Sequence, residues 1–302
     1  MAVNLASIPP LLLPGLRAIT GKYDEIPSEW PEIFEKGTSK MAVERTNEVR
    51  FMPIAQIKNE GAPTTFDNLS GSRFTYIQQH QVLSLGYAMT REMIEDNLYK
   101  DKFGPTQNNL QLSFRQTEDI FAANVLNTAG TYNSAVGGDG KAMCATNHPI
   151  DSGTYANRPS TDTDLNETAL ESANILLRYF QDQAGLKTPA KPIKLVVPPQ
   201  LKYTATRILE TELRVGTANN DVNAMRKVGD YKKGIVVNDY LTSNFFWFIL
   251  TDKKGGLYLE RAPFETDMQV DFSTDNILVK ARKRFSFSYY DPRWIFGSLP
   301  TS

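Results

Sequence analysis

The stretch "MCATNHPI" holds the one cysteine of the chain, Cys144, and one of its two histidines, His148. A thiol beside an imidazole becomes a nucleophile when the fold brings the two side chains together and a third group orients the ring. A thiol-dependent enzyme that uses Cys144 is therefore one interpretation. The sequence Asn-His-Pro is also typical of a turn, because Pro149 fixes the backbone. We expect this structural role, in which His148 shapes a turn.

Two further stretches carry part of a ligand-binding pattern. "DTDLNE" begins like a calcium loop at Asp162, but its sixth position is Glu167 instead of Gly and its twelfth is Ala173 instead of Glu. "GGDGKA" lacks the Ser or Thr that follows the lysine of a phosphate-binding loop. One cysteine and two histidines are too few for a zinc site. We predict no catalytic, metal or cofactor site and expect a protein that is not an enzyme.

The composition is that of a globular protein. The 302 residues are 41% hydrophobic and 22% charged, with a formal net charge of -1, so the whole chain is not a strong nucleic-acid binder. A single cysteine excludes an intramolecular disulfide. The apolar run "IPPLLLPGL" contains three prolines and is too short to span a membrane, so we expect no membrane association.

Residues 1–48 predict an extended N-terminal arm, because their prolines interrupt any long helix. The arm is nevertheless apolar, which indicates that it packs on another surface, either the rest of this chain or a neighbouring subunit. The residues that we expect at contacts between subunits are Leu11, Leu12, Leu13, Trp30 and Phe34. Deletion of residues 1–35 is expected to leave a soluble fold.

Residues 49–85 predict a long β-hairpin with a wide tip, since two strand-like runs flank the turn-rich stretch "NEGAPTTFDNLSG". Neither face of its second arm is cleanly apolar, which favours a ribbon that lies on a partner. The contact residues expected here are Glu60, Phe66, Arg73, Phe74 and Tyr76.

The longest predicted helix covers residues 106–129, between Pro105 and Gly130. One apolar stripe runs along it and is expected to pack on the rest of the fold, at Leu110, Phe114, Phe121 and Val125. Residues 166–275 predict a mixed α/β unit with its own core. The stretch "NILVKARKRFSFSYY" then alternates as a long strand with one apolar face, on which Lys283 also lies.

The order of these elements resembles tailed-bacteriophage major capsid proteins with the Hong-Kong-97-type fold, and most closely the Mu-like major head subunit group. Four stretches carry the resemblance: "EGAPTTFDNLSGSRFTYIQQHQVLSLGYAMTREMIEDNLY", "LQLSFRQTEDIFAANVLNTAG", "LVVPPQLKYTATRILE" and "NILVKARKRFSFSYYDPRWIFGS". In that family they look like the extended loop, the spine helix, the strand–proline–helix unit of the axial domain and the closing strand of the peripheral domain.

The resemblance implies an α+β fold in five parts. These are an N-terminal arm (1–48), an extended loop (49–85), a peripheral domain (86–165) with its spine helix at 106–129, an axial domain (166–275), and a return strand with the C-terminus (276–302).

The resemblance also implies a major capsid protein that self-assembles, as pentamers and hexamers, into the icosahedral shell of a tailed double-stranded DNA phage. The expected partners are further copies of the chain, other virion proteins such as a portal, a possible scaffold or decoration protein, and packaged DNA contacted non-specifically. The expected location is the virion, assembled in the cytoplasm of the host bacterium. An encapsulin-type cellular compartment shares the fold and is the alternative, with the Cys144 enzyme less favoured.

Overall fold

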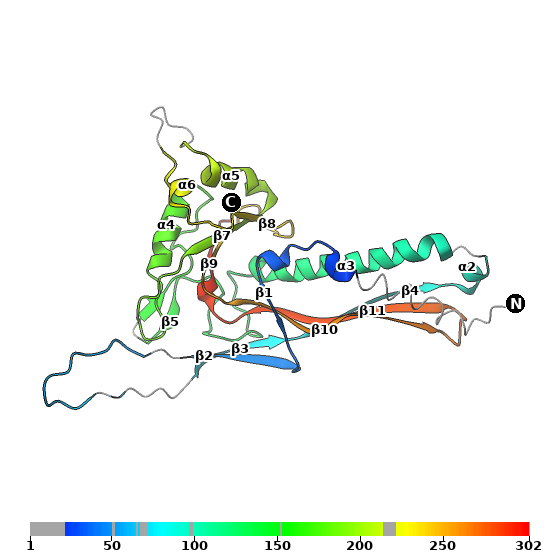
Figure 1. The fold of residues 1–302 in the computed structure, drawn as a ribbon, viewed down its shortest axis with the longest axis horizontal. Helices are drawn as coiled ribbons and strands as arrows, with labels where there is room; N and C mark the ends of the chain where they lie inside the picture. The colour runs from blue at the N-terminus through cyan, green and yellow to red at the C-terminus, as the bar shows by residue number, and fades with distance from the viewer. Residues whose placement is uncertain are drawn as a thin grey trace.

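The computed structural model describes residues 22–49, 52–64, 66, 72–96, 99–151, 153–213 and 222–301. Figure 1 shows an elongated body made of a long sheet and a long helix, with an α/β unit at one end and a thin loop that projects beyond that end. No helix within these described ranges is both long and apolar enough to cross a membrane.

The long sheet has four strands in the order β1-β10-β11-β4. They are β1 (Glu35–Thr38), β10 (Gly256–Val270), β11 (Ile277–Tyr289) and β4 (Gln81–Met89). β1 is parallel to β10, and the other neighbours are antiparallel. The alternation of β11 buries one face of it, from Ile277 through Phe285 to Tyr289. The sheet therefore joins the N-terminal, middle and C-terminal parts of the chain.

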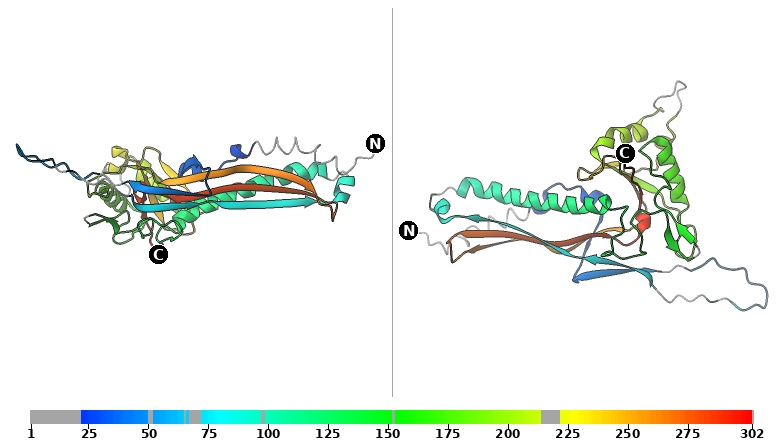
Figure 2. Two further views of the ribbon diagram at one scale, coloured as in Figure 1. Left: turned by 90° about the horizontal axis from the view of Figure 1, so that it is seen from below. Right: turned by 180° about the vertical axis from the view of Figure 1, so that it is seen from behind.

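Helix α3 (Tyr99–Asn127) lies along this sheet (Figure 2) and follows the short helix α2 (Arg91–Glu95). It begins seven residues before the predicted start at Thr106 and contains Pro105. Pro105 is the seventh residue of α3, beyond the first turn where a helix tolerates proline best, so the helix loses one backbone hydrogen bond there and crowds the ring against the carbonyl four residues before it. Packing against the sheet offsets that loss, so the predicted start was wrong.

The α/β unit is built on a second four-stranded sheet, in the order β12-β9-β7-β8. Its strands are β7 (Pro192–Val197), β8 (Ile235–Val237), β9 (Trp247–Thr251) and β12 (Ile295–Ser298). Its helices are α4 (Glu167–Arg178), α5 (Lys202–Glu210) and α6 (Ala224–Val228), with a 3-10 turn η4 (Pro199–Leu201) before α5. The core between them is large and apolar, and includes Leu170, Leu177, Phe180, Leu195, Trp247 and Phe296.

The strand pairing differs from the predicted boundary of the α/β unit at residue 275. The predicted unit 166–275 includes the stretches "GLYLER" and "MQVDF", but these fall at the two ends of β10, which pairs with β11 in the long sheet. The register shifts between Glu260 and Glu265, around Pro263, and this bulge interrupts the alternation that marks a continuous strand. The C-terminal strand β12 enters the α/β sheet instead.

The hairpin is formed by β2 (Val43–Val49) and β3 (Ser72–Gln79), so its paired part begins six residues earlier than residue 49. The second predicted arm is divided at His80, because the chain leaves the hairpin there and continues as β4 in the long sheet. A smaller hairpin joins β5 (His148–Ile150) to β6 (Gly153–Tyr155).

Three short 3-10 helices complete the described secondary structure. They are η2 (Tyr23–Glu25), η3 (Trp30–Glu32) and η5 (Pro292–Trp294). The largest apolar cluster contains Trp30, Phe248 and Phe285. It therefore joins the N-terminal segment (residues 22–34), the α/β sheet and the long sheet.

Candidate functional site

Cys144 and His148 do not act on each other in this fold. Cys144 is fully buried, and burial raises the pKa of its thiol to about 12. Both ring nitrogens of His148 have other partners, Nδ1 at 2.5 Å from Asp139 Oδ2 and Nε2 at 3.0 Å from Asn157 Oδ1. A nucleophilic thiol needs a lowered pKa and a contact with its base. The Cys144 enzyme therefore has no support in the geometry.

His148 has a structural role, although it lies at the start of strand β5 rather than in the turn that we predicted. Its partner Asn157 is fully buried and joins three segments. The Asn157 amide nitrogen donates to the carbonyls of Met143, Pro292 and Ile295, and its oxygen accepts from the Ala145 amide at 2.8 Å. Sequence reasoning missed Asn157, because nothing in its neighbours distinguishes it from other loop asparagines.

The stretch with part of a calcium pattern makes contacts within the protein. Asp162 is ion-paired with Arg158, and its Oδ1 accepts from the amide of Leu299 at 3.0 Å. Asn166 caps helix α4, with its Oδ1 accepting from the Ala169 amide at 2.7 Å. Among the described residues, no group of three or more His, Cys, Asp or Glu side chains is placed to hold a metal ion.

The N-terminal segment lies on the body of the molecule rather than apart from it. The Trp30 ring packs 4.1 Å from the Tyr258 ring, and Phe34 packs on Phe287 and Trp294. Trp30 and Phe34 are each only 3% exposed. The prediction that they contact a neighbouring subunit is therefore corrected, since their apolar surface is covered by their own chain. Leu11, Leu12 and Leu13 lie outside the described residues.

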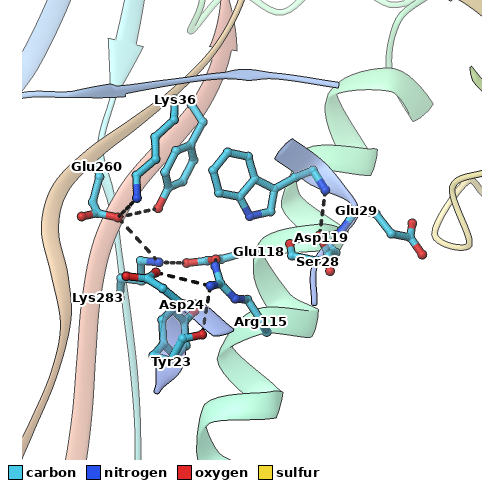
Figure 3. Close-up of polar contacts among 12 residues, drawn as sticks. Tyr23, Asp24, Ser28, Glu29, Lys36, Arg115, Glu118, Asp119, Glu260 and Lys283 are labelled. Carbon is cyan, nitrogen blue, oxygen red and sulfur yellow. Dashed lines mark hydrogen bonds and ion pairs between the residues drawn. The ribbon is translucent and has the colours of Figure 1, made fainter. Parts of the chain in front are cut away.

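Charged side chains hold this segment where it crosses α3, as Figure 3 shows. Arg115 of α3 donates to the Tyr23 carbonyl at 3.0 Å and to Glu118 at 3.1 Å. Glu118 also forms an ion pair with Lys283 of β11. Burial lowers the pKa of Lys283, while Glu118 and Glu260 act in the opposite direction. A buried charge of one sign needs such a partner, so the three side chains act as one unit.

Part of this charged cluster can be recognised in the sequence. Lys283 was placed on the apolar face of the long strand, where a lysine requires an anionic partner. Arg115 and Glu118 are three residues apart and therefore share a helix face, but neither was predicted to be buried. Both carboxylates of this helix turn, Glu118 and Asp119, are buried.

Tyr76 is also covered by its own chain, with 1% of its surface exposed. Strand β3 docks against the segment before Cys144, since the Ile77 amide donates to the Val136 carbonyl at 2.7 Å and the Gly138 amide donates to the Thr75 carbonyl at 3.0 Å. A Cβ atom on Gly138 would lie 2.3 Å from the Tyr76 ring. The predicted contact with a neighbour is thus corrected for Tyr76, and Phe74 packs against the same core.

Among the described segments, the loop between β2 and β3 is the one best suited to contact a partner. Its backbone leaves the body (Figures 1 and 2), and four large apolar side chains on it are exposed: Met52 at 60%, Ile54 at 74%, Ile57 at 97% and Phe66 at 90%. Glu60 is exposed among them, and Arg73 lies in β3 at the end of the loop. These exposed apolar side chains are the ones that a contact with another surface would cover.

The predicted stripe of α3 faces two clusters. Leu110 and Phe114 are buried with Tyr23 and Phe264, while Phe121 and Val125 are partly buried against the largest cluster. The helix therefore presents its apolar side to the long sheet and to the N-terminal segment.

Several solved structures with a similar fold are of capsids or a virus-like particle. The capsid of a native GTA particle has a TM-score of 0.56 at 9% identity, covering 89% of each chain. The mature capsid of bacteriophage PhiM1 has a TM-score of 0.55 at 14% identity, covering 91% of this chain and 89% of that one. A virus-like particle from Pyrococcus furiosus has a TM-score of 0.51 at 10% identity, covering 94% and 98%.

The sequence also matches a family directly. No curated protein is similar to the chain, but the family model described as phage capsid protein matches residues 77–297. That range includes α3, both four-stranded sheets except β1 and the end of β12, and the Asn157 junction. The chain therefore belongs to the phage capsid protein family and has the Hong-Kong-97-type fold.

Proposed function

We propose that this chain is the major capsid protein of a tailed double-stranded DNA phage, and that many copies of it close into the icosahedral shell of the head. The single observation that carries the proposal is the family match over residues 77–297. The structure adds a physical reason for assembly, because a folded chain that displays a long apolar loop is incomplete as a monomer.

The extended loop is proposed to lie across an adjacent copy. Full burial of a large apolar side chain is worth about 1.5–3 kcal/mol, and Ile54, Ile57 and Phe66 are exposed in the free chain. The free energy of one such contact is modest. In a closed shell, however, the loop of each copy lies on a neighbour, and each copy is also covered by the loop of another neighbour. Glu60 and Arg73 are proposed to contribute polar contacts at the same interface.

The α/β unit is proposed to gather around the axes of pentamers and hexamers, as the axial domain of the family does. Its outer surface supports this role, since Ile175 and Tyr179 at α4, Tyr203 on α5 and Val228 on α6 are all more than half exposed. The long sheet with α3 is proposed to meet its neighbours across local threefold axes, as the peripheral domain.

Further partners follow from the role of a head shell. The proposed partners are a portal, a possible scaffold or decoration protein, and the packaged DNA. The net charge of -1 supports only weak, sequence-independent contact with that DNA. The proposed location is the virion, assembled in the host cytoplasm, and the protein acts there as a structural subunit rather than an enzyme.

Electron microscopy and light scattering of the purified chain test the proposal. The unaltered chain is expected to form shells or rings of five or six. The double substitution Ile57→Asp with Phe66→Asp is expected to give only small species, with Glu60→Gln in the same loop as the matched control. All three proteins should melt within about 2 °C of each other, because exposed positions have small effects on stability. A monodisperse unaltered monomer under shell-favouring salt would refute the proposal.

A cellular compartment shell is the second candidate, since a virus-like particle from a cellular organism, Pyrococcus furiosus, has a similar fold. The two candidates differ in what the particles enclose. Particles purified from the native source should contain double-stranded DNA if the chain is a phage head protein, and a cargo protein if it encloses a compartment. Nuclease-protected DNA of uniform length would exclude the compartment.

A further inference from the structure

The base of the extended loop, where β2 ends, contacts the rest of the fold through a charged side chain. Glu48 is the last residue but one of β2, and its Oε1 accepts a hydrogen bond from Arg293 at 3.1 Å. The two side chains are 11% and 6% exposed, so this ion pair is largely shielded from water. Arg293 lies in η5, between β11 of the long sheet and β12 of the α/β sheet. The pair therefore ties the start of the loop to the junction of the two sheets.

Arg293 is a fixed point, because its surroundings hold it on several sides. Its guanidinium lies over the Tyr155 ring, 5.2 Å from the centroid, and also forms an ion pair with Asp291 at 3.4 Å. Its amide donates to Asp291 at 3.0 Å, and its carbonyl accepts from the Thr251 hydroxyl of β9 at 2.7 Å. A side chain held in this way does not follow Glu48 when the hairpin swings, so a swing of the hairpin breaks the contact.

The strand pairing of the hairpin is irregular at the same place. Asn47 pairs with Thr75 and Val49 pairs with Ser72, so β3 uses one residue more than β2 across this step. A bulge of this kind bends a strand pair and changes its direction. Glu48 lies between the two pairs, which means that the bend is held where it occurs. The direction of the loop beyond the bend therefore depends on the contact with Arg293.

The other strand of the hairpin is held at a different point. Strand β3 is hydrogen-bonded to residues 136–138 at Thr75 and Ile77, and the Tyr76 ring packs 5.8 Å from the Tyr289 ring. A two-stranded hairpin is only marginally stable by itself, so its attachments to the body decide its direction. One attachment leaves the hairpin free to turn, whereas an attachment on each strand sets its angle.

We propose that Glu48 and Arg293 are positioning residues for assembly, and that their ion pair aims the extended loop at the adjacent copy. The inference rests on the proposed function, in which Ile54, Ile57 and Phe66 of the loop lie on a neighbour. A loop that is already aimed in the free chain loses less conformational freedom when it docks. The pair thus strengthens the contact between copies without adding area to it.

The direction of the loop is measured in the single full-length chain as the distance between two spin labels. One label is attached at Met52→Cys, just beyond β2, and the other at Tyr203→Cys on α5, and both positions are exposed. Ile57→Asp and Phe66→Asp are included to keep the chain unassembled. With Glu48 present, the distance distribution is expected to be narrow. Glu48→Ala is expected to broaden or displace it, because the hydrogen bond that ties β2 to η5 is lost.

Two variants serve as controls for this measurement. Glu48→Gln should keep the narrow distribution, since its amide oxygen still accepts from Arg293. Glu44→Ala should also keep it, because Glu44 lies on the same strand but accepts from Ser39 at 2.6 Å. Glu48→Asp keeps a carboxylate near Arg293 on a shorter side chain and should give an intermediate distribution, which preserves the test if Glu48→Ala does not fold. Cys144 is buried and stays unlabelled.

The threshold concentration for assembly is the second measurement, made on chains without labels or the two aspartates. Glu48→Ala is expected to need about tenfold more protein than the unaltered chain to form particles, and Glu48→Gln about the same amount. Each chain is measured well below its melting temperature. Lys283→Met controls for a loss of stability that leaves the base of the loop intact, and it should keep the threshold. An equal rise in the threshold of Lys283→Met would overturn the proposal.

The distance measurement separates this proposal from the proposed function. A folded Glu48→Ala chain with the distribution of the unaltered chain would overturn the proposal. A changed distribution with an unchanged threshold would also overturn it, because the pair would then fix the loop without serving assembly. If the unaltered chain never forms particles, the proposed function fails and the role in assembly fails with it, whereas the distances still decide whether the pair fixes the loop.

Discussion

Lys283 of β11 and Glu118 of α3 form an ion pair inside the molecule, where their side chains are 2% and 0% exposed. Arg115 approaches the same carboxylate from the preceding turn of α3 and also holds the backbone of Tyr23. The strand, the helix and the N-terminal segment are therefore joined by one set of charges. Breaking the Lys283–Glu118 ion pair should therefore destabilise all three elements.

Lys283→Met is expected to destabilise the unassembled chain by up to about 3–5 kcal/mol, because the buried Glu118 carboxylate loses one of its two cationic partners and keeps Arg115. The double change Lys283→Met with Glu118→Gln should recover much of this loss, since it removes the buried carboxylate while the new amide oxygen still accepts from Arg115, which keeps its ion pair with Asp24. Urea unfolding followed by circular dichroism measures both. A double variant less stable than either single variant would show that the pair is not coupled as the geometry indicates.

Asn157→Ala is expected to cost about 3 kcal/mol or more, because it leaves three buried carbonyls without their donor. Asn147→Ala changes an exposed asparagine of the same region and should have an effect below about 0.5 kcal/mol. Thermal and urea unfolding of the two variants provide the comparison. Equal losses of stability in the two variants would show that Asn157 does not join the three segments.

Cys144 is expected to react slowly with thiol reagents in the folded chain. With a pKa raised to about 12, the reactive thiolate is scarce at pH 8, and the buried sulfur is also inaccessible. Labelling with a disulfide reagent should be at least about 100-fold slower than in urea, and activation by His148 would appear as an inflection near neutral pH. Rapid labelling with such an inflection would restore the thiol enzyme as a candidate.

His80 is expected to make the base of the hairpin sensitive to acid. Its Nε2 lies 2.9 Å from Ser39 Oγ, which donates to Glu44 at 2.6 Å, and the Ser286 hydroxyl lies 3.1 Å from its Nδ1. In the neutral ring, Nε2 donates to Ser39 and Nδ1 accepts from the Ser286 hydroxyl. Burial, with Arg284 and Arg261 nearby, lowers the pKa of His80.

A lowered pKa in the folded state stabilises the fold above the ordinary pKa of 6.5 and loses this contribution as the pH falls through the shifted value. Hydrogen exchange in β2 and β3 should therefore accelerate below about pH 6.5. The His80→Asn chain, measured in parallel, should lack this acceleration, which separates His80 from His148. Acceleration of equal size in both chains would assign the effect elsewhere.

Two truncations separate the roles of the N-terminal residues. Deletion of residues 1–35 removes Tyr23, Trp30 and Phe34 from apolar clusters, so we now expect an unstable or aggregated product rather than the soluble fold that the sequence indicated. Deletion of residues 1–21 keeps these side chains, so it should lower the melting temperature less than the longer deletion does. A well-folded product of the longer deletion would contradict the packing described here.

Elements with strong periodicity were accessible from the sequence, and elements defined by distant partners were not. The alternation in β11 and the stripe on α3 depend on neighbouring residues, which is why both were predicted. The division of the second hairpin arm at His80 depends on β11, about 200 residues away. No pattern among neighbouring residues indicates a partner strand so distant in the sequence.

Side-chain contacts in the candidate site were hard to predict for the same reason, because they also depend on residues far apart in the sequence. Trp30 and Phe34 were recognised as apolar residues in need of a surface, but sequence alone left open whether that surface belonged to the same chain. Glu118 and Asp119 looked like ordinary helix charges because their partners, Lys283 and the amides before Trp30, come from other elements. The first arm of the hairpin was predicted in "VRFMPIAQIK", but residues 52–58 of that stretch form no strand, and the paired strand is β2 before them.

The strand order has a consequence for the timing of synthesis. β12 is the last described strand and forms an edge of the α/β sheet, while β11, just before it, lies between β10 and β4 in the long sheet. The long sheet therefore lacks an inner strand until Tyr289 has been synthesised, and the α/β sheet lacks its edge strand until Ser298 has been synthesised. A chain that terminates before these residues cannot complete either sheet.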